Sequence, residues 1–428
     1  MKVLMFGWEF PPHITGGLGT ASYGLCKGLL KQGMEVIFTV PKLYGDEDNS
    51  VAKMVGAENI EVDFRHPVYK EVWSKLTYIA INARLIPYVG LDEYYSLQKS
   101  DAKGSVGGDG FKRKFSFSGK YQANLIEEVY RYAMVASTIA SEQEFDVIHA
   151  HDWLTYQAGI EAKRVSGKPL VIHVHATEYD RSGENVNPLV YSIEREGMLA
   201  ADRIITVSNL TRQTVIDRYG IDSKKVVTVH NAVEPTDDEA KKSLVAEKHI
   251  SQKVVTFLGR LTFQKGPEYF IEAAHKILEK DDDVRFVVAG AGDMYNKMVE
   301  RVAGLRIGSR VLFTGFLKGL EVDKMFLLSD VYVMPSVSEP FGISPLEAMR
   351  SHVPVVISKQ SGVSEILNYA LKVDFWDVGA MADAVYALLH YSALSSMFKK
   401  YGTVEVDNLK WENAAKKVVN VYKDALNG

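Results

Sequence analysis

The sequence predicts an α/β protein made of two doubly wound domains, each built on a parallel sheet. Short apolar runs rich in Val and Ile alternate with helical patterns along most of the 428 residues. Most of these runs are continuously apolar, which is typical of parallel strands covered by helices on both faces. The series of runs starts again after residue 252, and a chain of this length exceeds one ordinary core.

The expected strands follow one another in two series. The first series consists of KVLMF (2–6), EVIFTV (35–40), DVIHAH (146–151), LVIHVH (170–175), RIITVS (203–208) and KVVTVH (225–230). The second consists of VVTFLG (254–259), VRFVVAG (284–290), RVLFTG (310–315), VYVMPS (331–336) and VPVVIS (353–358). Strand–helix–strand alternation of this kind is typical of doubly wound sheets.

A polar, charged segment at 235–252 separates the two series and predicts the domain boundary. We therefore expect domains at 1–235 and 236–410. Residues 411–428 form an amphipathic helix whose apolar stripe includes Trp411 and Val418. Residues 100–120 are rich in glycine and show little periodicity, so they are expected to form a loop or insertion of the first domain.

Composition narrows the class of protein. A net charge of −4 does not favour a nucleic-acid or anionic-membrane surface. The single cysteine, Cys26, excludes an internal disulfide and fits a reducing compartment. No apolar run reaches the roughly 18 residues of a membrane span, and the N-terminus lacks the pattern of a signal peptide. A cytoplasmic protein is expected.

Ligands of doubly wound sheets bind outside the carboxyl ends of the strands, and the loop GWEFPPHITGGLG (7–19) follows the first strand. It lacks the third glycine of a dinucleotide fingerprint, and the second strand ends in Pro41-Lys42 without a carboxylate for a ribose. Near the helix expected from about Thr20, the amides of Gly16 and Gly17 are placed to meet an anion or a sugar hydroxyl. The alternative is a tight turn.

The segment SVSEPFGISPLEAM (336–349) carries two carboxylates eight residues apart. Because Pro340 disfavours helix at the preceding residue, Glu339 is expected in the loop after a strand and Glu347 on the following helix. The amides of Phe341, Gly342 and Ile343 lie between them and are expected to face an anion. The alternative is a helix with two solvated glutamates.

Two further turns follow strands of the second series. GRLTFQKG (259–266) places Arg260 and Lys265 just after a strand, and these two cations suit a diphosphate. Gly290, in GAGDMY, admits a nucleotide or simply forms the turn. The acidic run 281–283 precedes a strand, at the edge away from ligands, and is interpreted as a solvated turn.

Two strands of the first series end in His-x-His. Alternation places His149 and His151 on one side of their strand, and His173 and His175 on one side of theirs. Zinc is one interpretation, but no further ligand spacing supports it, and no metal is expected. His151, Asp152 and His175 lie nearest the loops, where substrates bind, and Trp153 follows them. His151, Asp152 and Trp153 are the expected acceptor contacts.

Taken together, these motifs resemble the retaining glycosyltransferases of family 4, which have the two-Rossmann GT-B architecture with a cleft between the domains. The resemblance covers nearly the whole chain through the glycine-rich first loop, HAHDW, TVSNLTR, VHNAV, GRLTFQKG, the E-x7-E segment and the terminal Trp-containing helix. It implies a nucleotide-sugar donor, a saccharide acceptor, and no metal or other cofactor. It also implies that the last helix crosses back onto the first domain.

The resemblance also implies a role for each site residue. Arg260 and Lys265 would bind the donor diphosphate, Glu339 would face the donor sugar and Glu347 would hold the ribose. His175 would lie beside the reacting sugar. The remaining donor contacts would be Gly16, Gly17, Gly290, Phe341, Gly342 and Ile343.

Within the family, HAHDW and GGLG resemble glycogen and starch synthases, which extend α-1,4-glucan from ADP- or UDP-glucose. The bacterial synthases carry a lysine where this chain has Thr15. Other acceptors therefore stay open: a small sugar, a lipid-linked saccharide or an exopolysaccharide precursor. The segment GFKRKFSFSGK (110–120) is either a lipid interface or a surface loop. A nucleotide-sugar epimerase and a catalytically silent binding module are further alternatives.

Overall fold

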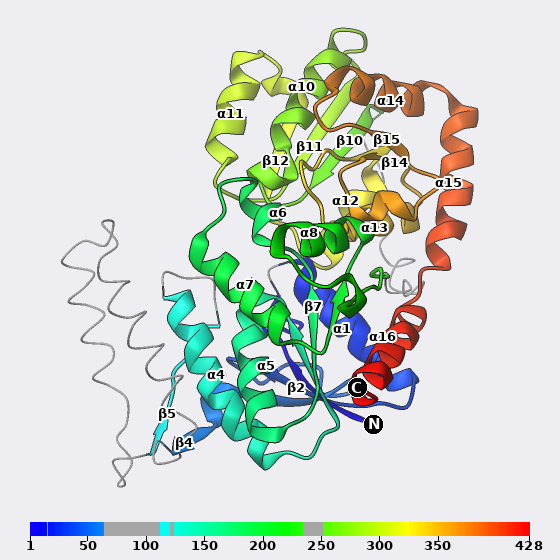
Figure 1. Ribbon diagram of the computed structural model, residues 1–428. Helices are drawn as coiled ribbons and strands as arrows, with labels where there is room; N and C mark the ends of the chain where they lie inside the picture. The colour runs from blue at the N-terminus through cyan, green and yellow to red at the C-terminus, as the bar shows by residue number, and fades with distance from the viewer. Residues whose placement is uncertain (15, 64–111, 120–123, 234–250) are drawn as a thin grey trace, which may run out of the picture.

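The computed structural model describes residues 1–14, 16–63, 112–119, 124–233 and 251–428. Two α/β domains lie one above the other in Figure 1, each built on a sheet whose neighbouring strands are all parallel. The predicted fold class is therefore confirmed. Among the helices of the described ranges, none carries an apolar stretch long enough to cross a membrane.

The first sheet has the strand order β3-β2-β1-β6-β7-β8-β9. Its strands are β1 (Lys2–Phe6), β2 (Glu35–Val40), β3 (Lys53–Gly56), β6 (Val147–His151), β7 (Leu170–Val174), β8 (Arg203–Thr206) and β9 (Val226–Thr228). Its helices are α1 (Gly17–Lys31), α4 (Leu125–Glu142), α5 (Trp153–Ser166), α6 (Glu178–Ser182), α7 (Pro188–Ala200) and α8 (Asn209–Tyr219). One core cluster packs under α4, α5 and α7, and another under α1 on the opposite face.

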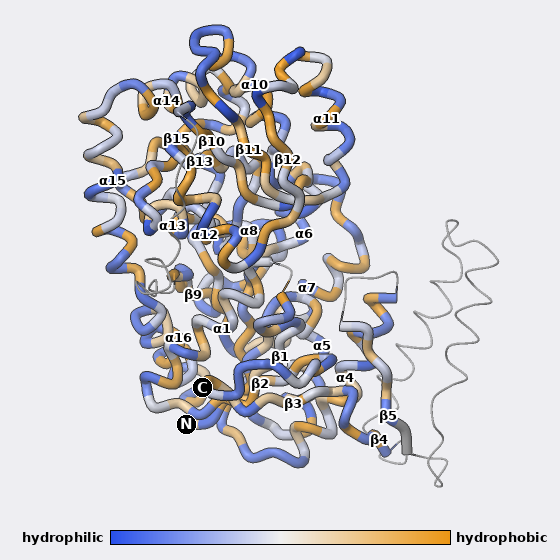
Figure 2. The backbone as a smooth tube through the Cα atoms, turned by 180° about the vertical axis from the view of Figure 1, so that it is seen from behind, coloured by the Kyte–Doolittle hydropathy of each residue, from blue (hydrophilic) through white to orange (hydrophobic). Residues whose placement is uncertain are grey.

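The second sheet has the order β12-β11-β10-β13-β14-β15. Its strands are β10 (Lys253–Leu258), β11 (Val284–Ala289), β12 (Val311–Gly315), β13 (Val331–Met334), β14 (Val355–Ser358) and β15 (Leu371–Val373). Its helices are α10 (Pro267–Leu278), α11 (Tyr295–Gly304), α12 (Leu320–Leu328), α13 (Ser344–Arg350), α14 (Val378–His390) and α15 (Ser392–Asp407). Figure 2 shows hydrophobic residues along its central strands, which are buried on both faces.

Strand order reverses once in each sheet, between β1 and β6 and between β10 and β13. In doubly wound sheets the crevice at such a reversal binds the ligand. The opening glycine loop follows β1, and Asp152 follows β6, which ends at His151. Arg260 and Glu339 lie in the turns that follow β10 and β13. The topology therefore places the predicted site residues at the ligand-binding edges.

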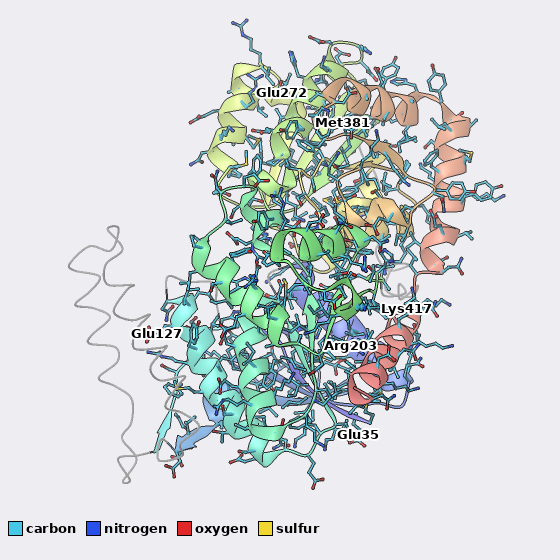
Figure 3. The ribbon with its side chains drawn as sticks, in the orientation of Figure 1. Glu35, Glu127, Arg203, Glu272, Met381 and Lys417 are labelled. Atoms are coloured by element: carbon cyan, nitrogen blue, oxygen red, sulfur yellow. The ribbon has the colours of Figure 1, made fainter. Side chains whose placement is uncertain are left out.

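The last helix, α16 (Trp411–Leu426), packs against α1 of the first domain (Figure 1). Two glycines of α1 make this contact close. A Cβ on Gly24 would lie 2.2 Å from Trp411 Nε1, and one on Gly28 would lie 2.6 Å from the Trp411 carbonyl oxygen. Figure 3 labels Arg203, which donates from β8 to the backbone oxygen of Asp424 at 3.4 Å. The C-terminal segment thus completes the core of the first domain.

The structure corrects two expectations. Helix α1 begins at Gly17 and not near Thr20, because extended Gly16 precedes it and the Glu9 carboxylate accepts a 3.2 Å hydrogen bond from the Gly19 amide. In the expected loop at 100–120, residues 112–114 form β5 (Lys112–Lys114), paired antiparallel with β4 (Glu61–Asp63). Phe117 is buried and packs 6.3 Å from the Tyr132 ring, so it faces the core and not a lipid surface.

Several expectations fall on residues outside the described ranges. These are the departure at Thr15, residues 100–111 and 120 of the expected loop, and the domain boundary except for residues 251 and 252.

Candidate active site

Lys265 and Glu339 meet at the carboxyl edge of the second sheet. Lys265 ends the short 3-10 helix η3 (Phe263–Lys265), and its Nζ lies 2.5 Å from Glu339 Oε2. The Glu339 side chain is only 8% exposed. Ser336 Oγ donates to the same carboxylate oxygen at 3.3 Å. The pair therefore places one cation and one shielded carboxylate at the ligand edge.

The backbone fixes the loops that carry this pair. The Glu339 amide donates to the Gln360 carbonyl, and the Gly362 amide donates to the Glu339 carbonyl, both at 2.9 Å. The Val337 amide donates to the carbonyl of Gln264, which precedes Lys265, also at 2.9 Å. Gly266 has φ 62° and no space for a Cβ, which would lie 2.3 Å from the Pro335 carbonyl oxygen. These contacts lock the lysine turn onto the Glu339 loop.

The segment that follows Glu339 turns sharply into α13. Gly342 adopts φ 101°, which favours glycine, and Phe341 is buried. Glu347 lies in the first turn of α13 and is partly buried. Burial raises the pKa of Glu347, and Arg350 opposes that shift. Two carboxylates thus flank the 341–343 backbone, one in the loop and one on the helix.

The other two donor candidates lie in neighbouring turns. Arg260 is exposed in the turn after β10. Gly290, after β11, has φ 150°, and a Cβ there would lie 1.8 Å from the Gly259 carbonyl oxygen. Its amide donates to the Gly315 carbonyl at 2.8 Å. Close packing of the two turns is therefore a sufficient reason for glycine at this position.

The first domain faces this site with the start of α1. Gly16 and Gly17 are both exposed. A Cβ on Gly17 would lie 3.9 Å from Ile343 Cδ1 of the second domain, whereas one on Gly16 would meet nothing within 4 Å. The glycine loop and the 341–343 segment therefore lie opposite each other where the two domains meet.

The histidines of β6 and β7 and His175, which directly follows β7, form a stacked cluster. The rings of His149 and His151 lie 4.3 Å apart, as do those of His173 and His175. His151 Nδ1 lies 2.9 Å from His175 Nε2, so one hydrogen bond fixes the His175 ring. Burial lowers the pKa of His175 to about 3. His175 is therefore a neutral imidazole at physiological pH.

The same stacking disfavours shared metal coordination by His149, His151 and His173. Their ring nitrogens lie within 4.8 Å of one another. However, the interplanar angles are only 12°, 21° and 27°. A metal ion at about 2.0–2.1 Å must lie near the plane of each ligating ring, and nearly parallel, stacked planes do not converge on one point. This arrangement instead suits packed, neutral imidazoles.

Asp152 holds the backbone beside His175. Its Oδ1 accepts hydrogen bonds from the amides of His175 at 3.1 Å and Ala176 at 3.2 Å. Burial raises the pKa of Asp152 to about 6, against the opposing effect of Arg181. Protonation of this carboxyl group near neutral pH would weaken its hold on the loop that carries His175.

The three expected acceptor contacts are less accessible than the sequence suggests. His151 has no exposed surface, so the expectation that it contacts an acceptor directly is wrong for this conformation. Its side chain instead supports His175. Asp152 is 8% exposed and Trp153 is 9% exposed, at the start of α5. These two residues retain a small surface on the ligand side of β6.

Sequence reasoning missed three groups around the site. Glu9 is buried directly after β1 and caps the first turn of α1. Asp180 forms a capping box with Thr177 at the start of α6 and also accepts a hydrogen bond from Ser338 of the second domain. Arg181 pairs with two buried carboxylates, those of Glu178 and Glu194. The spacing Thr177-x-x-Asp180 is a capping signature, and it was the available sequence signal for Asp180.

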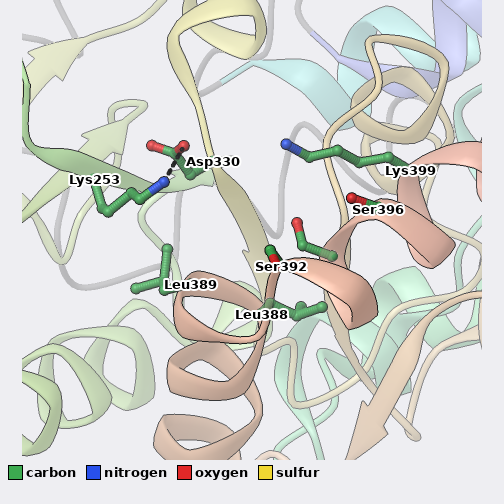
Figure 4. Close-up of a pocket in the computed structure, with 8 residues that line it drawn as sticks. Lys253, Asp330, Leu388, Leu389, Ser392, Ser396 and Lys399 are labelled. Atoms are coloured by element: carbon green, nitrogen blue, oxygen red, sulfur yellow. Dashed lines mark ion pairs between the residues drawn. The ribbon is translucent and has the colours of Figure 1, made fainter.

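A separate pocket lies at the opposite, amino edge of the second sheet (Figure 4). It is bordered by the Lys253–Asp330 ion pair at 3.5 Å and by the start of α15, where Ser392, Ser396 and Lys399 lie. Because strands β10 and β13 begin there, this pocket is remote from their carboxyl ends. It is not part of the site described above.

Two family models match adjacent parts of the chain. "Glycosyltransferase Family 4" matches residues 110–237, and "Glycosyl transferases group 1" matches residues 238–404. Together they span more than half of the sequence, and their junction falls, in sequence, after β9 and before β10.

Individual relatives agree with this match. An uncharacterized glycosyltransferase of Methanocaldococcus jannaschii is 28% identical over 100% of this chain and 99% of its own. A glycogen synthase of Mycobacterium tuberculosis is 23% identical over 100% of this chain and 96% of its own. The sucrose-phosphate synthase structure from Thermosynechococcus elongatus superposes with a TM-score of 0.70 at 16% identity, covering 99% of this chain and 98% of that one, and so supports the fold. With two facing Rossmann-like domains and these matches, the chain belongs to the family 4 glycosyltransferases of GT-B fold.

Proposed function

We propose that this protein transfers a hexose, glucose in the first instance, from ADP- or UDP-glucose to an α-glucan with retention of anomeric configuration. The observation that carries the proposal is the Lys265–Glu339 pair. The segment that follows Glu339 brings Ile343 next to Gly17 of the other domain. The carboxylate of Glu339, for the sugar, and the ammonium group of Lys265, for the diphosphate, thereby lie together at the carboxyl edge of the second sheet. The first turn of α1 offers backbone amides from the other domain.

The charges suit departure of a nucleoside diphosphate. As the glycosidic bond breaks, the anomeric carbon becomes cationic and the leaving diphosphate becomes more negative. Lys265 and exposed Arg260 supply positive charge to the diphosphate, together with amides of the 341–343 segment. Glu347 holds the nucleotide ribose from the first turn of α13, and Gly290 borders the nucleotide.

His175 acts as a neutral group beside the reacting sugar. Because its pKa is about 3, it neither carries charge nor serves as an acid at neutral pH. Its backbone carbonyl steadies the developing cation, and the Asp152 hydrogen bonds hold that backbone in place. The acceptor approaches along the first domain, near Asp152 and Trp153. The proposed location is cytoplasmic, and the proposed transfer requires no metal.

The experiment is a transfer assay across nucleotide-sugars and acceptors. With ADP- or UDP-glucose and glycogen, we expect release of the nucleoside diphosphate and longer glucan chains. If sugar is transferred only to a small sugar, a lipid-linked saccharide or an exopolysaccharide precursor, that compound and not α-glucan is the acceptor. Conversion of the nucleotide-sugar without any acceptor would support an epimerase and contradict transfer.

A further inference from the structure

One hydrogen bond joins the two domains directly beside Glu339. Ser338 Oγ donates to Asp180 Oδ1 at 2.6 Å, although the residues are 158 positions apart. Asp180 is only 7% exposed. Its other oxygen accepts from the Thr177 amide at 2.7 Å and from the Thr177 hydroxyl at 2.8 Å. One carboxylate oxygen of Asp180 thus caps the start of helix α6, and the other accepts a hydrogen bond from the second domain.

Helix α6 connects the two sides of the site. In the chain it follows His175 closely, and in space it contacts η3, the turn that ends in Lys265. Its Asp180 binds the residue that immediately precedes Glu339. The hydrogen bond therefore links the loop of the neutral histidine to the loop of the donor carboxylate.

A second set of contacts holds the other flank of Glu339. Thr211 Oγ1, in α8, donates to the Pro340 carbonyl at 3.4 Å. Glu365, at the end of the 3-10 helix η5 (Gly362–Glu365), accepts from the amides of Asn209 at 2.9 Å and Leu210 at 2.7 Å. The two chain neighbours of Glu339 are thus each bonded to the first domain.

We propose that Asp180 is a positioning residue that sets the Glu339 loop only when the domains are closed. This inference rests on the proposed function, because it concerns the same donor site. Separation of the domains breaks the Ser338–Asp180 and Thr211–Pro340 contacts together. The Lys265–Glu339 pair and the Gln360 hydrogen bond remain, since both lie within the second domain.

The consequence is a coupling between closure and chemistry. In the open protein the second domain still binds the nucleotide, but the Glu339 loop lacks the support of the first domain. Closure restores that support and also excludes water, so the activated donor meets the acceptor and not solvent. Loss of the Ser338–Asp180 hydrogen bond should therefore reduce the rate of sugar transfer more than it reduces the affinity for the nucleotide.

The test uses Ser338→Ala, which removes only the donated hydrogen bond, and Asp180→Asn, which removes the charge of the acceptor. Ser141→Ala is the matched control, because its hydroxyl donates at 2.8 Å to Thr138 of the same helix, remote from the site. We expect Ser338→Ala to lower kcat about tenfold or more, as for loss of a charge-assisted hydrogen bond. The dissociation constants of UDP and ADP should stay within about twofold of wild type.

The double variant should be no slower than the slower single variant. Both changes act on the Ser338–Asp180 hydrogen bond, and any effect on the Thr177 hydrogen bonds is already present in Asp180→Asn. A second measurement does not need activity. Small-angle X-ray scattering without ligand should give a larger radius of gyration for both single variants than for wild type and Ser141→Ala. An unchanged radius, additive losses of kcat, or equal losses of kcat and nucleotide affinity would overturn the proposal. If wild type transfers no sugar at all, the proposed function fails while the scattering result still decides whether the hydrogen bond favours closure.

Discussion

Lys265 Nζ lies 2.5 Å from Glu339 Oε2, and the two residues are separated by 74 positions in the chain. Lys265 is 23% exposed and Glu339 is 8% exposed, so this ion pair is shielded from water on most sides. Each charge stabilises the other while no donor is bound. In the proposed function, a diphosphate that reaches this edge meets a lysine already held in place.

Breaking this pair from one side should harm both stability and turnover. Lys265→Met leaves the Glu339 carboxylate buried without its cation, which costs several kcal/mol when a pair is fully buried and less here, because Lys265 is partly exposed. Turnover should fall by about 100-fold or more, because the leaving diphosphate loses a cation. The measurements are the melting temperature and kcat.

The double variant Lys265→Met/Glu339→Gln separates the two effects. It removes both charges, so the melting temperature should return toward wild type while activity stays low. Recovery of turnover in the double variant would show that the lysine serves only to neutralise Glu339.

The pH dependence of kcat should report Asp152 and not His175. Burial raises the pKa of Asp152 to about 6, so its carboxylate is lost as pH falls through that value, along with its hold on the His175 and Ala176 amides. Activity should therefore decline below about pH 6. His175, whose pKa is about 3, stays neutral across this range.

Asp152→Asn should lower kcat and should abolish the decline of kcat below about pH 6. His175→Ala should also lower kcat but should keep that decline. If the decline of kcat below about pH 6 disappears in His175→Ala, the titrating group is the histidine and not Asp152. Unchanged melting temperatures in both variants would show that the fold is intact.

The stacked histidines predict a loss of stability on acidification. Burial lowers the pKa of all four below the usual value of 6.5: His149, His151, His173 and His175. Below about pH 6.5 the unfolded chain binds protons at these positions and the folded chain does not, so the free energy of unfolding falls as pH falls. Three carboxyl groups oppose this trend because burial raises their pKa values: Glu194 to about 7, Asp152 to about 6, and Glu347. They are fewer than the four histidines.

Melting temperatures measured from pH 7.5 to 4.5 test this prediction. His173→Leu removes one buried imidazole and should make the decline shallower. A decline of equal slope in wild type and His173→Leu would remove that histidine from the explanation.

The contact between α1 and α16 should tolerate no side chain at Gly28. A Cβ there would lie 2.6 Å from the Trp411 carbonyl oxygen and 2.8 Å from Ala415 Cβ. Gly28→Val should destabilise the protein by about 1–3 kcal/mol through overpacking. Gly304→Val, near the end of α11, is the control, because its Cβ would meet nothing within 4 Å. Equal thermal stability of the two variants would show that α16 is held elsewhere.

The sequence predicted the fold well because parallel strands covered on both faces are continuous apolar runs. KVLMF and VVTFLG therefore stand out, and both are central strands. The short strands β3 and β15, at the sheet edges, carry too little apolar pattern to be recognised. β5 was missed because its residues, Lys112–Lys114, are all cationic.

The site was partly predictable for a different reason. Turns that follow strands must meet at one edge of a sheet, so Lys265 and Glu339 could be placed together from topology. The burial of His151 could not be predicted, because it depends on how the rings of two neighbouring strands stack. The Ser338–Asp180 hydrogen bond depends on the relative placement of two domains, which no local pattern encodes.

The most direct test of the central claim is calorimetric titration with ADP and UDP of wild type, Lys265→Ala and Lys276→Ala. Lys276 is exposed in the last turn of α10 and serves as the matched charge control. We expect wild type and Lys276→Ala to bind one of these nucleotides with similar affinity, and Lys265→Ala to bind it at least tenfold more weakly. Equal affinity in all three proteins would contradict a diphosphate site at Lys265.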